Sequence, residues 1–359
     1  VEEKELAGGC VLVRQNGEEC CYLEAGMADV EAGKPFERNQ IYRLYSMSKP
    51  VTGAAAMKLF EEGALDLGQP VSAYLPSFQD SLVEQDGRLV KADRQIQVQD
   101  LLNMTSGLVY NGDAGLPGRH ADAVFGELME RLWTDHPMTT RELAVRLGEG
   151  PLLFQPGSSW KYGSSADVLG AVIEAASGMS FGAYLEKNFF EPLGMKDTGF
   201  FVPEEKRDRL VTVYQADGNG GLVPYLENHL GIINAMDRKP AFESGGAGLV
   251  STVDDYARFA QMLLNRGELD GVRVLKPRTV DYMTSGTLNG TQREAFVRNF
   301  PTMPGYDYGN LVRVMREPGK SCTLNNAGEY GWDGWLGCYF ANDPAADMTI
   351  LFMMQKTDS

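Results

Sequence analysis

The sequence predicts an α+β protein, in which one antiparallel sheet is assembled from both ends of the chain around a helical middle. Short apolar runs at residues 9–14 and 20–27 are separated by Asn16-Gly17, which is typical of a β-hairpin. The middle of the chain carries helical periodicity instead. Strand-like runs return near the C-terminus, at residues 334–342 and 348–355.

The elements between these strands follow from periodicity and capping residues. A helix is predicted from residue 46 to 62, with Pro50 near its start, where a missing N–H costs little, and Gly63 at its end. Glycine-rich loops are expected at residues 112–118 and 218–221. Further helices are expected at residues 98–104, 139–147, 164–177, 181–189, 252–266 and 276–284.

The length of 359 residues fits one large domain or two ordinary ones. With 43% hydrophobic and 23% charged residues, a globular core is feasible. Because strands lie at both ends, residues 1–65 and 240–359 are expected to form an α/β sheet domain. Residues 66–239 are expected to form a helical domain.

The charge balance argues against two classes of partner. The chain carries 33 Lys and Arg against 49 Asp and Glu, a net charge of −16. A field of that sign repels nucleic-acid phosphates and anionic membrane surfaces. The longest uncharged apolar run, residues 348–354, is far shorter than the ~20 residues of a spanning helix. We therefore expect no nucleic-acid partner and no membrane insertion, while the oligomeric state stays open.

Cysteine and histidine usage favours neither a disulfide framework nor a metal site. The five cysteines are odd in number and include no C-x-x-C pair, which favours buried thiols in a reducing compartment. The three histidines are not spaced like metal ligands on one helix. We expect no metal, no cofactor and a cytoplasmic location. The first residues lack signal-peptide features, but the chain opens on Val1, so a removed leader and a periplasmic or secreted location stay open.

The first candidate for chemistry is Ser46, three residues before Lys49 at the start of a predicted helix. This spacing places both side chains on one face, and the helix N-terminus offers N–H groups to a developing oxyanion. A lysine whose pKa is lowered by burial can help to deprotonate the hydroxyl. The alternative is that Ser46 caps the helix and Lys49 is solvated.

A second candidate is Tyr162, at the junction between the turn at residues 155–158 and the next predicted helix. Such a tyrosine can be held rigidly, and beside a lysine its phenolate becomes accessible as a base. The alternative is an aromatic side chain that packs the loop. For Ser164, a role as a helix cap is favoured over a role in chemistry, because a serine with an aspartate three residues later, here Asp167, is typical of a helix cap.

The third candidate is the segment at residues 330–340, where glycines lie among aromatic residues in a predicted strand. Glycine in a strand indicates close approach of a backbone or ligand, and such an edge can supply a second oxyanion N–H. The alternative is an edge strand packed with aromatic side chains.

These three motifs, in chain order, resemble those of the serine β-lactamase and penicillin-binding-protein superfamily. They are Ser46-x-x-Lys49, Tyr162-x-Ser164 and Trp332-Asp333-Gly334. The tyrosine in the middle motif is similar to that of class C β-lactamases, their DD-peptidase relatives and family VIII carboxylesterases. Residues 101–108, 154–157, 192–198 and 244–249 fit the family as well, so the resemblance covers roughly residues 8–355. It implies a β-lactamase/transpeptidase-like fold with the active site in the cleft between the two domains.

Two positions depart from the family pattern. Ser164 stands where class C enzymes carry an Asn that contacts substrate. Trp332-Asp333-Gly334 stands where Lys-Thr-Gly would help to receive a β-lactam carboxylate, and it is closer to the Trp-Gly-Gly of some esterases. Like charges ~4 Å apart repel by about 4 kcal/mol at an effective dielectric of about 20, so efficient β-lactam hydrolysis is not expected. Trp332 and Trp335 suggest a pocket for apolar acyl or alcohol groups of the substrate, and Asp333 favours a substrate group with a positive charge.

The resemblance implies a metal-independent serine hydrolase that forms an acyl-enzyme on Ser46. Lys49 and Tyr162 would jointly accept the serine proton, and Tyr162 or a Tyr-Lys relay would return one to the leaving group. The backbone N–H groups of Ser46 and Trp335 would form the oxyanion hole, because Trp335 matches the residue after Lys-Thr-Gly. The other substrate-binding candidates are Ser164, Trp332, Asp333 and Gly334.

The expected substrate is a small ester, lactam or amide, and carboxylester hydrolysis is favoured. β-Lactamase, D-peptidase or amidase activity and acyl transfer use the same machinery and stay open. A non-catalytic penicillin-recognising module is the alternative from a different class.

One further motif is rejected. Residues 178–182 satisfy the G-x-S-x-G pattern of α/β-hydrolases, but that motif requires a preceding strand. Here a helix is predicted before it, Gly178 follows that helix, and Ser180 caps the next one. Only His229 follows as a possible triad histidine.

Overall fold

The structure is a computed structural model that describes residues 5–357. Eight strands pair into one antiparallel sheet in the order β12-β13-β14-β15-β16-β1-β2-β3. The strands are β1 (Gly8–Gln15), β2 (Glu18–Asp29), β3 (Lys34–Pro35), β12 (Tyr306–Gly309), β13 (Val312–Met315), β14 (Tyr330–Asp333), β15 (Tyr339–Asp343) and β16 (Met348–Met354).

Both ends of the chain meet in this sheet. Strand β1 lies between β2 and β16, so that Leu12 stands opposite both Tyr22 and Leu351. Asn16 and Gly17 join β1 to β2 with φ angles of 52° and 78°, the left-handed conformation that a two-residue hairpin turn requires. The predicted hairpin and the α+β class, with a sheet assembled from both termini, are confirmed.

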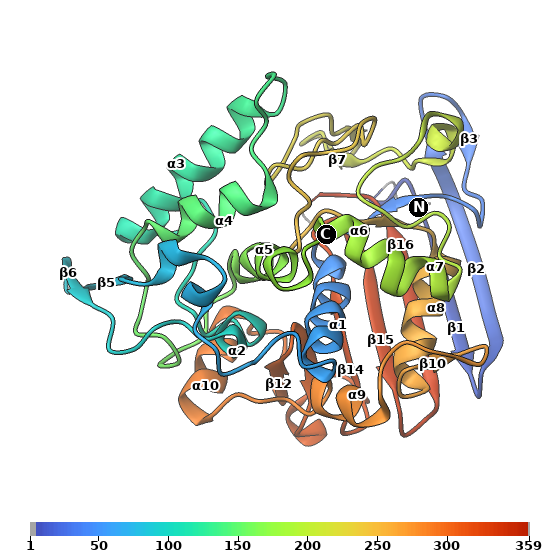
Figure 1. Ribbon diagram of the computed structural model, residues 1–359. Coiled ribbons are helices and arrows are strands. Elements are labelled where there is room, and N and C mark those ends of the chain that lie inside the picture. The colour runs from blue at the N-terminus through green and yellow to red at the C-terminus, as the bar shows by residue number, and fades with distance from the viewer. Residues whose placement is uncertain (1–4, 358–359) are drawn as a thin grey trace.

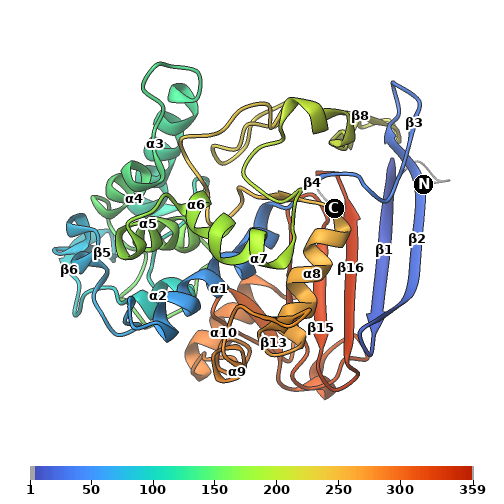
Figure 2. The ribbon, with the colours of Figure 1, turned by 45° about the vertical axis from the view of Figure 1, so that its right-hand side comes forward.

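One face of the sheet is covered by a long helix. Leu12, Phe340 and Leu351 are buried on that face, where α8 (Val253–Leu264) packs against β15 and β16. The Asn342 amide donates a hydrogen bond to the Ala260 carbonyl across this contact, at 2.8 Å. Figure 2 shows α8 lying across these two strands.

In Figure 1, α3, α4 and α5 lie on the side of α1 (Ser48–Glu61) that faces away from β1 and β2, whereas α6 and α7 lie on the same side of α1 as β16. The remaining helices are α2 (Val98–Leu102), α3 (Gly115–Arg131), α4 (Thr140–Gly148), α5 (Ser165–Ser177), α6 (Phe181–Leu185), α7 (Glu191–Leu193), α9 (Pro277–Met283) and α10 (Gly290–Asn299). Short pairs complete the fold: β4 (Tyr42–Arg43) with β9 (Val250–Ser251), β5 (Leu82–Gln85) with β6 (Arg88–Lys91), β7 (Tyr214–Ala216) with β8 (Leu222–Pro224), and β10 (Glu268–Leu269) with β11 (Val272–Arg273). The boundaries of the two domains stay a prediction.

Within the described residues no single helix is long and apolar enough to cross a bilayer. One bent pair, Ser165–Ser177 with Phe181–Leu193, passes that criterion by length and composition only.

Two predicted elements are wrong. Residues 112–118 are not wholly a loop, because α3 begins at Gly115 and runs through Gly118. A Cβ at Gly118 would lie 1.7 Å from the Asp113 carbonyl oxygen, so this glycine permits a close backbone contact rather than breaking the helix. The predicted strand at 334–342 is in fact a turn followed by β15, and the Gly334 N–H closes the turn on the Cys338 carbonyl at 2.7 Å.

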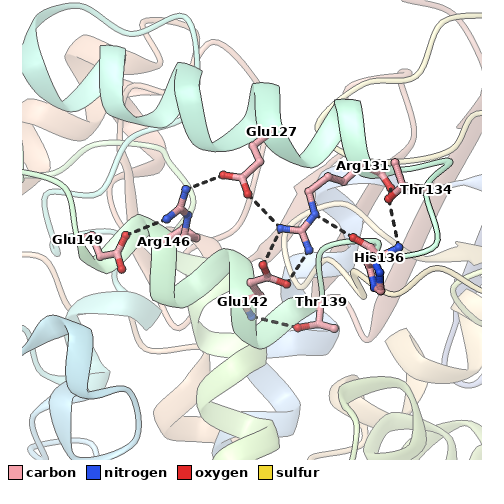
Figure 3. Close-up of polar contacts among 8 residues, drawn as sticks. All are labelled: Glu127, Arg131, Thr134, His136, Thr139, Glu142, Arg146 and Glu149. Carbon is pink, nitrogen blue, oxygen red and sulfur yellow. Dashed lines mark hydrogen bonds and ion pairs between the residues drawn. The ribbon is translucent and has the colours of Figure 1, made fainter.

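Helices α3 and α4 are joined by a surface network of ion pairs, shown in Figure 3. Arg131 contacts Glu127 at 3.0 Å and Glu142 at 2.6 Å, while Arg146 contacts Glu127 at 2.7 Å and Glu149 at 3.5 Å. These five side chains are 24% to 51% exposed, so water and salt reach all of them.

Candidate active site

Ser46 lies in a short 3-10 turn, Tyr45–Met47, directly before α1, rather than in the first turn of the predicted helix. Tyr45 has a φ of 44°, which is rare for a non-glycine residue and costs conformational energy. Strained backbone beside a serine is typical of functional sites. Ser46 is partly exposed, whereas its neighbours Tyr45 and Met47 are buried.

Lys49 is fully buried in the first turn of α1, so the solvated alternative is wrong. Its Nζ contacts Ser46 Oγ at 3.1 Å, the Gly246 carbonyl at 2.8 Å and Tyr110 Oη at 3.3 Å. Burial lowers the pKa of the Lys49 amine to about 7, although the negative charges of Asp167 and Asp333 act in the opposite direction. The structure therefore gives this lysine the properties of a base that works near neutral pH.

Tyr162 lies beside the same pair. Lys49 Nζ is 4.5 Å from the centre of the Tyr162 ring, and Ser46 lies close enough to the Tyr162 phenol to affect its pKa. Burial raises the pKa of the phenol above its ordinary value, and the nearby Ser46 hydroxyl and the N–H of Trp332 offset part of that shift. Tyr162 is therefore a neutral phenol near pH 7.

Trp332 contacts Tyr162 through a hydrogen bond and through ring packing. The indole Nε1–H donates to Tyr162 Oη at 3.1 Å, and the two rings lie 5.6 Å apart. Tyr308 and Phe300 complete the packing around Trp332, with ring centres at 5.0 Å and 5.7 Å. Trp332 is only 1% exposed, so it supports Tyr162 and does not line an open apolar pocket as predicted.

The end of β14 approaches the chain just before Ser46. A Cβ at Gly334 would lie 2.2 Å from the Leu44 carbonyl oxygen, so only glycine permits this approach. In the part of the chain that the structure describes, no group accepts a hydrogen bond from the Trp335 N–H. An N–H of this kind beside a serine is suited to receive an oxyanion.

Aromatic rings flank Trp335 on the side of Tyr45. The Trp335 ring lies 5.0 Å from Tyr45, 5.7 Å from Tyr225 and 4.1 Å from His229. Burial lowers the pKa of His229, so its imidazole is uncharged near pH 7. This cluster gives the Trp335 side of the site an apolar wall.

Asp333 is not paired with an arginine in the structure. Its Oδ1 is buried without a hydrogen-bond partner among the described residues, and the ion pair of nearby Arg313 is made with Glu329 at 3.3 Å. Burial raises the pKa of the Asp333 carboxyl, while Arg313 and Lys49 lower it. The Asp333 carboxyl therefore brings no positive charge to the site, and its electrostatic influence reaches Lys49.

Ser164 is fully buried, and its hydroxyl donates to the Val109 carbonyl at 3.0 Å. Its contact with substrate stays a prediction. It occupies the N-cap position of α5 but makes no side-chain cap, because its hydroxyl is already used by Val109.

The rejected G-x-S-x-G motif lies between two helices, as predicted. Gly178 ends α5 with a φ of 70°, and Ser180 Oγ accepts a hydrogen bond from the Ala183 N–H at the start of α6. Ser180 is therefore a cap rather than a nucleophile on a strand-to-helix turn.

Three residues of the site were missed by sequence reasoning: Tyr110, Asp167 and Gly246. Tyr110 Oη donates to Asp167 Oδ2 at 3.4 Å, and the Gly246 N–H donates to Asp167 Oδ1 at 3.0 Å. Asp167 looked like part of a helix cap, and only its place as the one acid in the otherwise uncharged stretch 165–173 of α5, all of which is buried, could have signalled another role. Among the residues described, no group of three or more His, Cys, Asp or Glu side chains could hold a metal ion.

Comparison with known proteins fits this geometry. A model of the Beta-lactamase family matches residues 1–359. An uncharacterized protein of Mycobacterium tuberculosis is 33% identical over 360 residues, spanning 98% of this chain and 86% of that protein. Esterase EstB of Burkholderia gladioli is 30% identical over 371 residues, spanning 98% and 87%.

Among solved structures, this chain is similar to EstCE1, described as a hydrolase with promiscuous acyltransferase activity. The TM-score is 0.83 at 27% identity, covering 99% of this chain and 91% of that one. With the family match across the full length, the chain belongs to the Beta-lactamase family and is a serine hydrolase.

Proposed function

We propose that this serine hydrolase is a carboxylesterase in which Ser46 is the nucleophile and neutral Lys49 is its base. The observation that carries the proposal is the contact set of Lys49. A neutral amine has two N–H groups and one lone pair. The Gly246 carbonyl can only accept, and Tyr110, whose hydrogen points to Asp167, accepts as well. The lone pair is then left for the hydroxyl hydrogen of Ser46, at 3.1 Å.

Tyr162 supplies the acid. Its oxygen accepts the Trp332 N–H, so its own hydrogen is available on the side of Ser46. When Ser46 attacks an ester carbonyl, Lys49 takes the serine proton and Tyr162 protonates the departing alcohol. The phenolate that forms is restored by the proton on Lys49, directly or through a water, which leaves the acyl-enzyme and a neutral amine. In deacylation a water molecule takes the place of the alcohol.

The oxyanion would be held by the backbone N–H groups of Ser46 and Trp335. Two observations support this role: none of the described residues accepts a hydrogen bond from the Trp335 N–H, and Gly334 approaches Leu44 closely.

Esters are favoured over β-lactams because of charge. Trp332 donates to Tyr162 through a neutral N–H where the family motif has a lysine, and Asp333 adds a carboxyl group. Neither side chain attracts a substrate carboxylate. The similarity to esterase EstB and to EstCE1 supports the same choice.

The experiment that tests this function combines active-site labelling with a substrate panel. Wild-type protein should form a single fluorophosphonate adduct on Ser46, detected by intact mass, and should hydrolyse short-chain p-nitrophenyl esters with a higher kcat/KM than nitrocefin. Ser46→Ala should lose both labelling and turnover. The matched control is Ser180→Ala, which removes the serine of the rejected motif and should keep both. Labelling of Ser46→Ala, or its loss in Ser180→Ala, would show that the nucleophile has been misassigned.

Acyl transfer is a second candidate, supported by the described activity of EstCE1. Adding a primary alcohol to the ester assay should yield a transesterified product if an acceptor other than water reaches the acyl-enzyme. Product formed only by hydrolysis would exclude this activity for the alcohols tested.

A further inference from the structure

Asp167 is the most enclosed acid near the site. It is 2% exposed, on the first turn of α5, and its carboxylate accepts hydrogen bonds from Ser244 Oγ, the Gly246 N–H and Tyr110 Oη. It does not contact Lys49 directly. Two of its three donors, Gly246 and Tyr110, are the same residues whose oxygens contact Lys49 Nζ.

The direction of these hydrogen bonds matters. A phenol has one hydrogen, and an ionised carboxylate can only accept, so the Tyr110 hydrogen is directed to Asp167 and the phenol oxygen is left as an acceptor. Without the carboxylate, that hydrogen is free to turn toward Lys49 and compete with Ser46 for the amine lone pair. The Gly246 peptide is fixed in the same way, because its N–H is held by Asp167 while its carbonyl faces Lys49.

We propose that Asp167 is a positioning residue for the base: its carboxylate fixes Tyr110 and the Gly246 peptide so that both oxygens occupy the N–H groups of Lys49 and its lone pair faces Ser46. Tyr110 is the second positioning residue, because its oxygen is one of the two that contact Lys49 Nζ. The inference rests on the proposed role of Lys49.

The charge of Asp167 has a separate, measurable effect. The titratable groups that face Lys49 are Asp167, Asp333, Tyr110 and Tyr162. Burial raises the pKa of all four groups, and for Asp167 the hydrogen bond from Ser244, the charge of Lys49 and the hydrogen bond from the Gly246 N–H act in the opposite direction. The negative charge of Asp167 raises the pKa of Lys49 and opposes the effect of burial. Removing that charge should therefore move the titration of Lys49 to lower pH. The loss of positioning should at the same time lower the rate of Ser46 labelling at high pH, where Lys49 is neutral.

The test measures the rate of Ser46 labelling by a fluorophosphonate as a function of pH, which needs no knowledge of the natural substrate. Asp167→Asn should lower the plateau rate on the order of 10- to 100-fold and shift the acidic limb to lower pH. Tyr110→Phe should lower the plateau similarly, with a smaller shift because the carboxylate remains. The control is Asp307→Asn, another buried carboxyl that accepts backbone N–H groups from Tyr308 and Leu288 but does not contact this site.

The outcomes separate the two proposals. An unlabelled Ser46 in folded wild-type protein overturns the proposed function and the positioning role with it. If the wild type is labelled but folded Asp167→Asn keeps its plateau within twofold and its limb unshifted, only the positioning role fails. If Asp167→Asn does not fold, Tyr110→Phe is the deciding variant, because it preserves the aromatic ring. A plateau labelling rate of Tyr110→Phe within twofold of wild type then overturns the proposal.

Discussion

Two networks of charged and polar side chains differ mainly in their access to water. Around Lys49 the amine is fully buried, and its pKa falls to about 7. Between α3 and α4 the network of Figure 3 is a quarter to half exposed, and hydrogen bonds from Arg146 and Arg131 hold the pKa of Glu127 below its usual range. Both networks contain short contacts, but only burial creates a group that can exchange a proton near neutral pH.

The physical reason is the cost of desolvation. An ammonium in a dry site loses its hydration, and the few dipoles around Lys49 do not replace it fully, so the neutral form gains. At the surface, water solvates each charge and salt screens the pairs, so Arg131 and Arg146 stay protonated whatever their partners do. The buried network should therefore control catalysis, and the exposed one should not.

The largest expected effect comes from removing the acid of the buried site. Tyr162→Phe should lower kcat by roughly 10²–10⁴, the usual contribution of a positioned acid or base, while ring packing against Trp332 is kept. The control is Tyr308→Phe, the same chemical change on another ring packed against Trp332. Its hydroxyl is buried without a partner among the described residues, so the loss should leave kcat unchanged. Equal effects of the two substitutions on kcat would reduce Tyr162 to a packing residue.

The second expected effect is on the pH profile of the wild type. Lys49 must be neutral to accept the serine proton, so kcat/KM should fall about tenfold per pH unit below about 7 and level off above it. The measurement is kcat/KM for a p-nitrophenyl ester from pH 5 to 9.

His229 is another titratable group near the site, because its ring lies 4.1 Å from Trp335. Burial lowers the pKa of its imidazole, and among the hydrogen bonds of the described residues the ring makes none to Lys49 or Ser46. In His229→Phe, the fall of kcat/KM at low pH (the acidic limb of the profile) should stay at the same pH as in the wild type. If the limb disappears in that variant, it belongs to His229 and not to Lys49.

Much of this site could be predicted because its parts are local in sequence. Ser46 and Lys49 lie one helical turn apart, and the family resemblance is confirmed by the match along the full chain. The catalytic roles of Ser46, Lys49 and Tyr162 stay predictions, although the structure brings the three side chains together. In the fold, the hairpin at Asn16-Gly17 could be predicted because two residues decide its geometry.

The rest depends on contacts that sequence spacing does not reveal. Tyr110 and Asp167 are 57 positions apart, and each alone has an ordinary explanation, as a loop aromatic and a helix cap. Trp332 was expected to line a pocket because its indole stands where the family motif has a lysine. Spacing alone does not show which way a strand residue faces, and in the structure Trp332 is buried against Tyr162. Helix α3 was missed because Gly118 looks like a helix breaker until its contact with Asp113 is known.

A third prediction uses the stability cost of the buried lysine. The folded state loses the Lys49 proton at about pH 7, whereas the unfolded chain keeps it up to the ordinary value of 10.5. Between these values the unfolded state binds more protons, so the stability of the wild type should rise with pH relative to Lys49→Met. The slope of the difference should approach about 1.4 kcal/mol per pH unit. It is measured by denaturant unfolding of both proteins at several pH values, and parallel stability curves would contradict a depressed pKa.

The smallest expected effect is at the surface network. Arg131→Gln removes the contacts to Glu127 and Glu142. It leaves no buried carboxylate without a cation, because both acids are already exposed to water. The melting temperature should change by less than about 2 °C, and kcat should stay the same. The small difference that remains should vanish at about 1 M salt, where the Debye length is about 3 Å.

The same change at a buried arginine provides the contrast. Arg313 and its partner Glu329 are 2% and 3% exposed, so Arg313→Gln leaves a buried carboxylate without its cation. Breaking such a pair costs about 3–5 kcal/mol, far more than the surface substitution, and added salt should not restore it. If Arg131→Gln instead destabilises the protein as strongly as Arg313→Gln, exposure is not what separates the two networks. The pKa of Lys49 would then have to be explained by the arrangement of its partners rather than by its burial.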